Sequence, residues 1–146
     1  MPTGFDYLGQ DRALQHHWSK RFLAIVLDVV LIYVPIIVFV TVLPGRSHVG
    51  AGLLLSGLAL FAYSSLFDYA IGGTVGKLAM HMKVVAMTGR LTMSQSIMRN
   101  VSKVFALLLL LDWIVGLAVE TRDPRQRWTD QVAHTSVIVY DHPDGV

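Results

Sequence analysis

The feature that most constrains the fold is an apolar run from Phe22 to Leu43, FLAIVLDVVLIYVPIIVFVTVL, with one charged residue, Asp28. A helix of about 22 residues covers roughly 33 Å, which is enough to cross a bilayer core of about 30 Å. A carboxylate at that depth costs about 2.5–3.5 kcal/mol unless it is paired or faces protein or water. Arg21 lies two helical turns before Asp28 and shares its face. We therefore expect other parts of the chain to surround this acid.

Composition supports an integral membrane protein. Of the 146 residues, 53% are hydrophobic and 15% are charged, which is unusual for a soluble domain. The apolar residues form three long runs. The chain has no Cys, so disulfides, thiolate chemistry and Cys-based metal sites are excluded, and we expect no cofactor. The formal charge of +2 and the pI near 9.1 suit contact with anionic lipid headgroups and give no argument for nucleic acid.

The three runs predict an all-α integral membrane protein, a three-helix transmembrane bundle formed by a single membrane domain over residues 1–146. The expected segments are helices at about 22–43, 49–71 and 104–119, a basic loop at 72–103 and a polar tail at 120–146. In the basic loop, MKVVAM and RLTMS flank Thr88–Gly89, which predicts a small cytoplasmic β-hairpin between the second and third helices. The tail contains a second β-prone stretch, TSVIVY.

The distribution of bases predicts the orientation in the cell membrane. Three bases precede the first helix, one lies in the first connection and five lie in the second, which places the N-terminus and residues 72–103 in the cytoplasm. The third run is short, because about 16 residues cover roughly 24 Å. Three full spans would place the tail outside, whereas a re-entrant third segment would keep it inside.

Three acids lie at compatible depths in the expected helices, namely Asp28, Asp68 and Asp112. The bases expected at the same level are Arg21, Arg99 and Lys103. One interpretation is that these groups neutralise each other and hold the helices in register. The other is a cation or proton site, because ionisable groups inside a membrane commonly mark such pathways.

Several short stretches match a known family in order and spacing. They are RFLAIVLD with Arg21 and Asp28, TVGK at Thr74–Lys77, KVV followed by Gly89, Arg99 at the start of the third segment, and RQRWTDQVAHTSVIV with Arg127 and Asp130. The chain resembles the RDD family of small membrane proteins, which is named for one Arg and two Asp, over Trp18 to Val139. Trp128–Thr129 departs from the residues usual in the family before the second Asp.

This resemblance implies a multi-pass membrane domain in which Asp130 is the second Asp of the family name. The resemblance also implies transport of unidentified ligands, and sodium–proton exchange has been attributed to some members of the family. Three full spans would separate Asp130 from Arg21 and Asp28 by the membrane. If the three residues act together, the third segment must re-enter or Asp130 must have a separate task.

Two functions remain open from the sequence. The first is a cation or proton transporter, or a subunit of one, which exchanges Na⁺ for H⁺ at buried carboxylates and forms a homo-oligomer. The alternative is a non-catalytic assembly or scaffold module that binds lipid or a membrane-protein partner. We do not expect an enzyme, because the sequence has no Ser/His/Asp spacing, no metal-ligand cluster and no nucleotide fingerprint.

Overall fold

A computed structural model describes residues 2–44, 49–119 and 123–140. The connection at 45–48 and parts of the expected tail, 120–122 and 141–146, lie outside the described residues. The chain begins with α1 (Gly4–Gln10), followed by the long helix α2 (Arg12–Val42). We expected this helix to start near Phe22, but Asp11 caps it ten residues earlier by accepting hydrogen bonds from the amides of Ala13 and Leu14.

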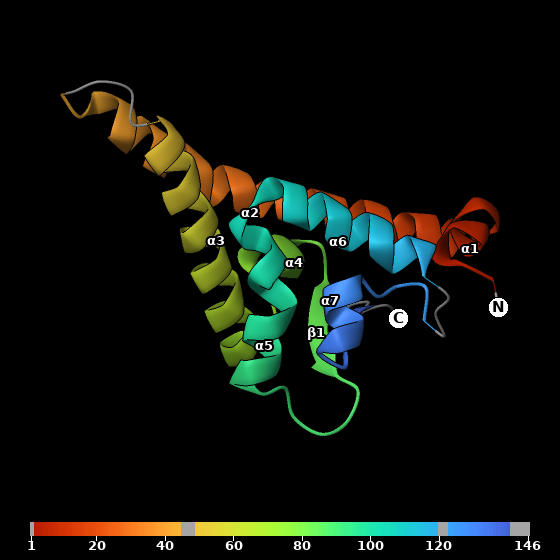
Figure 1. The fold of residues 1–146 in the computed structure, drawn as a ribbon. Coiled ribbons are helices and arrows are strands. Elements are labelled where there is room, and N and C mark those ends of the chain that lie inside the picture. The colour runs from red at the N-terminus through yellow and green to blue at the C-terminus, as the bar shows by residue number, and fades with distance from the viewer. Residues whose placement is uncertain (1, 45–48, 120–122, 141–146) are drawn as a thin grey trace.

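Helix α3 (Val49–Ile71) occupies the expected residues and forms an antiparallel pair with α2. The two helices meet at their loop end and diverge toward the other end (Figure 1). The angle between them contains α4 (Val75–Ala79), β1 (Met82–Ala86), α5 (Met93–Asn100) and α7 (Trp128–Val132). Helix α6 (Ala106–Ala118) runs along α2, and α1 lies at the far end of α2. The short helix α4 follows α3 and packs against α2. Gly76 makes this contact possible, because a Cβ at this position would lie 2.1 Å from the carbonyl oxygen of Ala24.

The third apolar run, expected as a helix at about 104–119, forms α6 (Ala106–Ala118), but this helix is not continuous with the helical segment before it. Helix α5 (Met93–Asn100) and the 3₁₀ turn η1 (Val101–Val104) run beside α3, and α6 then turns away with a bend of 115°. Its 13 residues cover roughly 20 Å, less than a bilayer core. Two helices, α2 and α3, are therefore long and apolar enough to span a membrane, or three if the bent pair counts as one span.

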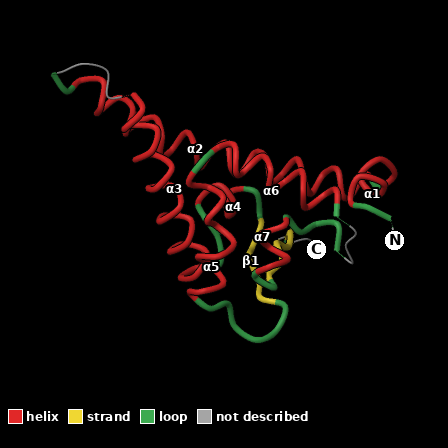
Figure 2. The backbone as a smooth tube through the Cα atoms, in the orientation of Figure 1, coloured by secondary structure: helices red, strands yellow, loops and turns green. Residues whose placement is uncertain are grey.

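The structure replaces the expected hairpin with a sheet that joins distant parts of the chain. Strand β1 (Met82–Ala86) pairs with β2 (Thr135–Val139) in antiparallel register, with Val84 opposite Val137 (Figure 2). The stretch after Thr88–Gly89 does not return as a strand, because Thr92 caps α5 and closes a capping box with Gln95. The prediction of a hairpin within 72–103 was therefore wrong, whereas the β-prone character of both paired strands was read correctly.

The C-terminal elements lie against the start of the chain. Helix α7 (Trp128–Val132) leads into β2, and Asp130 of α7 contacts Arg21 of α2 at 2.7 Å. No membrane thickness can therefore separate these two residues, so the separation of the tail from Arg21 that three full spans would require is wrong. The number of membrane crossings stays a prediction.

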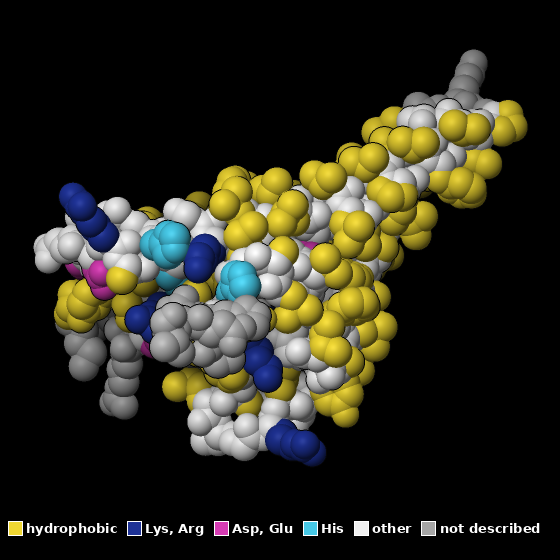
Figure 3. All heavy atoms as spheres, turned by 180° about the vertical axis from the view of Figure 1, so that it is seen from behind, with side chains coloured by type: hydrophobic (Ala, Val, Ile, Leu, Met, Phe, Trp, Pro, Cys, Tyr) yellow, Lys and Arg dark blue, Asp and Glu magenta, His cyan; other side chains and the backbone are white. Residues whose placement is uncertain are grey.

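Apolar side chains cover most of the surface of α2 and α3, as the yellow spheres in Figure 3 show. Phe39 and Val42, near the loop end of α2, are 64% and 78% exposed. Lys, Arg, Asp and His gather at the opposite end, near α1 and the C-terminal elements. Two small apolar cores lie at this end, one around Trp18 and Leu117 and the other around Val84 and Val137. Such an exposed apolar surface is suited to lipid.

Candidate functional site: a buried charge cluster

Among the described residues, nine charged side chains are buried where α2, α3, α4, α5, η1, α6 and the C-terminal elements converge. The five bases are Arg21, Lys77, Arg99, Lys103 and Arg127, and the four acids are Asp28, Asp68, Asp112 and Asp130. We call these nine residues the charge cluster. The charge cluster carries one positive charge in excess. The neighbouring buried residue His17 is not part of it and is counted as neutral. Buried charges of this kind persist only where partners replace the water they have lost.

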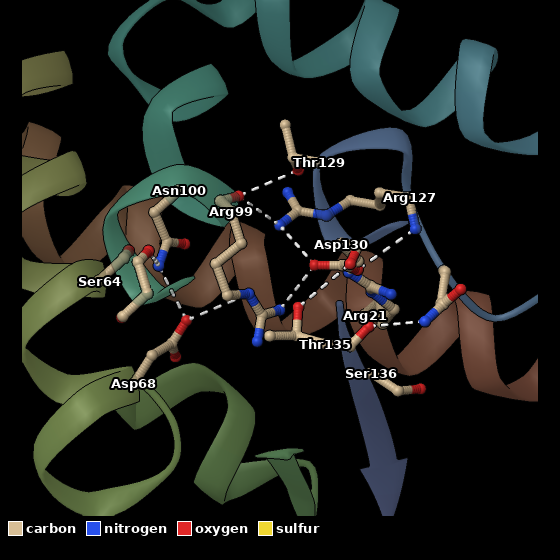
Figure 4. Close-up of polar contacts among 12 residues, drawn as sticks. Arg21, Ser64, Asp68, Arg99, Asn100, Arg127, Thr129, Asp130, Thr135 and Ser136 are labelled. Carbon is tan, nitrogen blue, oxygen red and sulfur yellow. Dashed lines mark hydrogen bonds and ion pairs between the residues drawn. The ribbon is translucent and has the colours of Figure 1, made fainter. Parts of the chain in front are cut away.

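Asp130 is the central acid of the charge cluster, because three arginines converge on it (Figure 4). Its carboxylate lies 2.7 Å from the Arg21 guanidinium, 3.0 Å from that of Arg99 and 3.4 Å from that of Arg127. It also accepts the backbone N–H of Arg127 at the start of α7. Burial raises the pKa of the Asp130 carboxyl, but the three guanidinium groups hold it well below its usual range. This acid is therefore a fully engaged anion.

Asp68, near the end of α3, is surrounded in the same way. Its two oxygens accept hydrogen bonds from the Lys77 ammonium at 2.6 and 2.8 Å. The Asn100 side chain donates to it at 2.9 Å, and Arg99 lies at 3.8 Å. Burial lowers the pKa of Lys77 to about 8, while Asp68 opposes this shift. Arg99 therefore lies between Asp68 and Asp130 and connects the end of α3 with α7.

Asp112 of α6 receives most of its contacts from the C-terminal segment. The backbone N–H and the hydroxyl of Thr129 donate to it at 2.7 and 2.8 Å, and Arg127 lies at 3.3 Å. Ser102 of η1 donates at 2.8 Å. The close approach of the two segments depends on Gly116, because a Cβ there would lie 2.6 Å from the amide nitrogen of Trp128. Asp112 thus joins α6 to the turn that precedes α7.

Asp28 differs from the other three acids because its partners are uncharged. Its oxygens accept hydrogen bonds from the hydroxyl of Thr74, from the backbone N–H of Gly76 at 2.9 Å and from the hydroxyl of Tyr63 at 3.2 Å. No ion pair joins it to a base within the described part of the chain. Arg21 shares its helix face but turns toward Asp130 and the carbonyl oxygen of Arg125.

Lys103 is the base without a carboxylate partner. Its ammonium donates to the hydroxyl of Ser64 at 2.8 Å, and none of the ion pairs found among the described residues includes it. The side chain is 3% exposed. Lys103 and Asp28 are thus the base and the acid of the charge cluster that lie outside its ion pairs, and the four bases and three acids within those pairs carry the excess positive charge.

The structure brings together most of the residues expected from the sequence, but not with the expected partners. Arg21, Arg99, Asp68, Asp112 and Asp130 belong to one continuous set of ion pairs. In this set a base lies between neighbouring acids, so the acids do not form a shared carboxylate site. Asp28 is buried nearby but is held by its own neutral donors.

Sequence reasoning missed several members of the site. They are Lys77, Arg127, Asn100, Thr74, Ser102 and Thr129. Two signals were present: TVGK contains both Thr74 and Lys77, and RQRWTD contains Arg127 and Thr129. These stretches were used to recognise the resemblance, but no partner was assigned to their side chains.

The carboxylates of the charge cluster are already occupied by hydrogen bonds and ion pairs. Among the described residues, no three His, Asp or Glu side chains are grouped so as to hold a metal ion. Each of the four buried carboxylates already accepts two or more hydrogen bonds or ion pairs. What the cluster can do is fix segments that lie more than 100 residues apart in the sequence, as Arg21 and Asp130 do.

Comparison with known proteins gives one match. The sequence fits the RDD family over residues 16–134, which is most of the chain and includes Arg21, Asp28 and Asp130. The search of curated proteins and the search of solved structures gave no match. The family match agrees with the apolar helices α2 and α3 and with the buried Asp and Arg pairs. The chain therefore belongs to the RDD family of membrane proteins.

Proposed function

We propose that this protein is a non-catalytic membrane module whose charge cluster holds the C-terminal segment against the α2–α3 pair. The observation that carries this proposal is the engagement of the acids. Asp130 is contacted by three arginines, and Asp68 and Asp112 each have a base and further donors. A Na⁺ ion needs oxygen ligands that are free of other cations, and these acids do not offer them.

The exposed basic residues support contact of the same module with anionic lipid. Lys83 and Arg90 are exposed and line an open cavity of about 760 Å³ beside Tyr69 and Ile71, at the end of α3. Because this end follows an apolar span, these bases lie where the headgroup region is expected. Each base near an anionic membrane surface contributes about 1 kcal/mol of attraction.

The test compares ion flux with stability in the same proteins. Purified wild type and Asp28→Asn are placed in liposomes with a Na⁺ gradient, and internal pH is followed with a trapped dye. We expect both proteins to give the proton flux of empty liposomes. We also expect Asp28→Asn to lower the melting temperature, because three donors, two of them buried, lose an anionic acceptor.

A second candidate is exchange of Na⁺ for H⁺ in which Asp28 carries the proton. The observation in its favour is that Asp28 is 1% exposed and has only neutral hydrogen-bond donors, unlike the other acids of the charge cluster. Na⁺-dependent proton flux that is present in wild type and absent in Asp28→Asn would support this candidate. The same result would contradict our proposal that the protein is a membrane module without transport activity.

The partners of the module follow from the same surfaces. We infer that the bilayer itself covers the exposed apolar residues of α2 and α3, and that a second copy or another membrane protein packs against part of them. A cell-membrane location with the N-terminus in the cytoplasm follows from the basic residues near α1 and after α3. Labelling with a membrane-impermeant thiol reagent at Ser94→Cys in intact cells and in inverted vesicles tests the orientation, because the chain has no other Cys. Modification in inverted vesicles but not in intact cells is expected.

A further inference from the structure

A small, partly open cavity lies beside the charge cluster. Its volume is about 20 Å³, and its wall includes four bases and one acid. These charged lining residues are Arg21, Lys77, Lys103, Arg127 and Asp28. A polar cavity of this size can hold one water molecule or one monatomic ion, but not a phosphate or a carboxylic acid. The charge of the wall favours a negatively charged occupant.

The hydrogen-bond donors around this cavity are incompletely used. Arg127 is 2% exposed, and its Nε–H has no acceptor among the described residues. The indole N–H of Trp113, another residue of the wall, is also buried without an acceptor in that part of the chain. Lys103 has three N–H donors and makes one hydrogen bond, to Ser64. Buried donors without acceptors cost about 1–3 kcal/mol each, so an additional acceptor would be stabilising.

The charge balance points in the same direction. The charge cluster contains five bases and four acids, and among the described residues neither Lys103 nor Asp28 takes part in an ion pair, so the cluster as a whole keeps one positive charge in excess. An uncompensated ammonium in a buried site is costly. One monovalent anion beside Lys103 would balance the cluster and accept the unused N–H bonds.

We propose that this cavity binds a single halide-sized anion, chloride under ordinary conditions, held by Lys103, Arg127 and the indole N–H of Trp113. The site is lined by segments from distant parts of the chain, since Arg21 and Asp28 come from α2, Lys77 from α4 and Val137 from β2. Bound chloride therefore connects α2 with the C-terminal strand. The anion is a structural component of the fold, and the site does not depend on whether the protein transports anything.

The first experiment measures thermal unfolding of the purified full-length chain in detergent. Sodium chloride replaces sodium gluconate at constant ionic strength, so that screening of surface charges is unchanged. We expect a saturable rise in melting temperature on the order of a few degrees with chloride and with bromide. A melting temperature that does not depend on the halide would overturn the proposal and would leave a water molecule as the occupant.

Two variants locate the effect. Lys103→Met should lose the halide dependence, whereas the matched control Lys83→Met, at an exposed lysine, should keep it. Lys103→Met in gluconate should also unfold no earlier than wild type in gluconate, because the uncompensated charge has been removed. If Lys103→Met kept a halide dependence with the same half-saturating concentration as wild type, the assignment of Lys103 to the site would be overturned.

Trp113→Phe provides a variant that keeps an aromatic side chain, although a smaller one, and removes the indole N–H. We expect its half-saturating bromide concentration to rise by about tenfold to a hundredfold, the effect of one lost hydrogen bond to a charged group. Line broadening of the ³⁵Cl resonance by wild type, and its loss in Lys103→Met, measures binding directly and does not require unfolding. Unchanged half-saturation in Trp113→Phe, or no broadening by wild type, would contradict the site.

Discussion

At the level of single residues, the sequence predicted which acids are buried better than it predicted their partners. The need to surround Asp28 followed from its depth in a lipid-length helix, and the structure places it at 1% exposure. Its donors Thr74 and Gly76 could not be predicted, because they come from α4, a five-residue helix formed after a glycine turn. No periodicity over so short a segment indicates which face it presents.

The bases after α3 show why charge counting is insufficient for assigning partners. The positive-inside rule treats all five bases of residues 72–103 as charges at the membrane surface. Lys77, Arg99 and Lys103 are buried instead, and only Lys83 and Arg90 are exposed. The rule contains no information on whether a base faces lipid headgroups or a buried carboxylate.

The lowered pKa of Lys77 gives a stability profile that can be measured. Its pKa falls from the usual 10.5 to about 8 in the folded protein, chiefly through burial. The unfolded chain therefore binds this proton more tightly, so the group destabilises the fold below pH 8 and this penalty is relieved between about pH 8 and 10.5. Relative to Lys77→Met, which cannot titrate, the free energy of unfolding of wild type should rise across this window by about 1–3 kcal/mol. A constant or falling difference in denaturant titrations would contradict the lowered pKa.

At the level of elements, the two long helices followed from the sequence and the bent third segment did not. Apolar runs of lipid length predict α2 and α3 because all backbone groups in such a run must be bonded within the helix. In the third run, the break between η1 and α6 depends on tertiary contacts. The carbonyl oxygen of Val104 lies where a Cβ of Gly57 would be, 2.0 Å away. Such a contact between distant segments leaves no signal at the bend itself.

This contact predicts different effects for two glycines of α3. Gly57→Ala should lower the free energy of unfolding by about 1–3 kcal/mol, because the added methyl group pushes α3 and η1 apart. Gly50→Ala, at a position with no neighbouring atom within 4 Å, should be neutral or stabilising by up to about 1 kcal/mol. Denaturant unfolding of the two variants in detergent compares them. Equal effects would mean that α3 and η1 do not approach as described.

The sheet illustrates a different limit of sequence-based prediction. A β-prone stretch followed by Thr88–Gly89 favours a hairpin by local rules, but those rules cannot compare the nearby partner with one 50 residues away. The C-terminal stretch TSVIVY is the better partner because Val84 and Val137, opposite each other, bury their side chains in one apolar core.

Cysteine pairs can test this strand pairing in a chain that has no native Cys. Lys83 lies opposite Ile138 in the sheet, so the double variant Lys83→Cys/Ile138→Cys should form a disulfide under mild oxidation. In the hairpin expected from the sequence, Lys83 would instead lie opposite Ser94. The pair Lys83→Cys/Ser94→Cys is therefore the control, and it should remain reduced on non-reducing gels. If only the control pair formed a disulfide, the pairing of β1 with β2 would be contradicted and the hairpin expected from the sequence would be supported.

At the level of the whole molecule, the exposed apolar surface and the buried ionic contacts lie in different parts of the fold. The α2–α3 pair presents apolar side chains to its surroundings, while the opposite end is assembled from short elements around the charge cluster. Two small apolar cores lie at this end, around Trp18 with Leu117 and around Met82 with Val137. The ion pair between Arg21 and Asp130, together with hydrogen bonds from Trp18 and Arg21 to the backbone carbonyl groups of Pro124 and Arg125, connects α2 with the C-terminal segment.

The most direct test of this connection is a double-mutant cycle between Arg21 and Asp130, which lie 109 residues apart in the sequence. The free energy of unfolding is measured for Arg21→Met, for Asp130→Asn and for the double variant, with Arg12→Met, at an exposed arginine of the same helix, as the matched control. Asp130→Asn should lower the free energy of unfolding by about 3–5 kcal/mol, because it removes the carboxylate that neutralises three buried arginines. The double variant should be less destabilised than the sum of the single variants by more than about 1 kcal/mol, whereas Arg12→Met and Asp130→Asn should add. Additivity within about 0.5 kcal/mol for Arg21 and Asp130 would contradict the account.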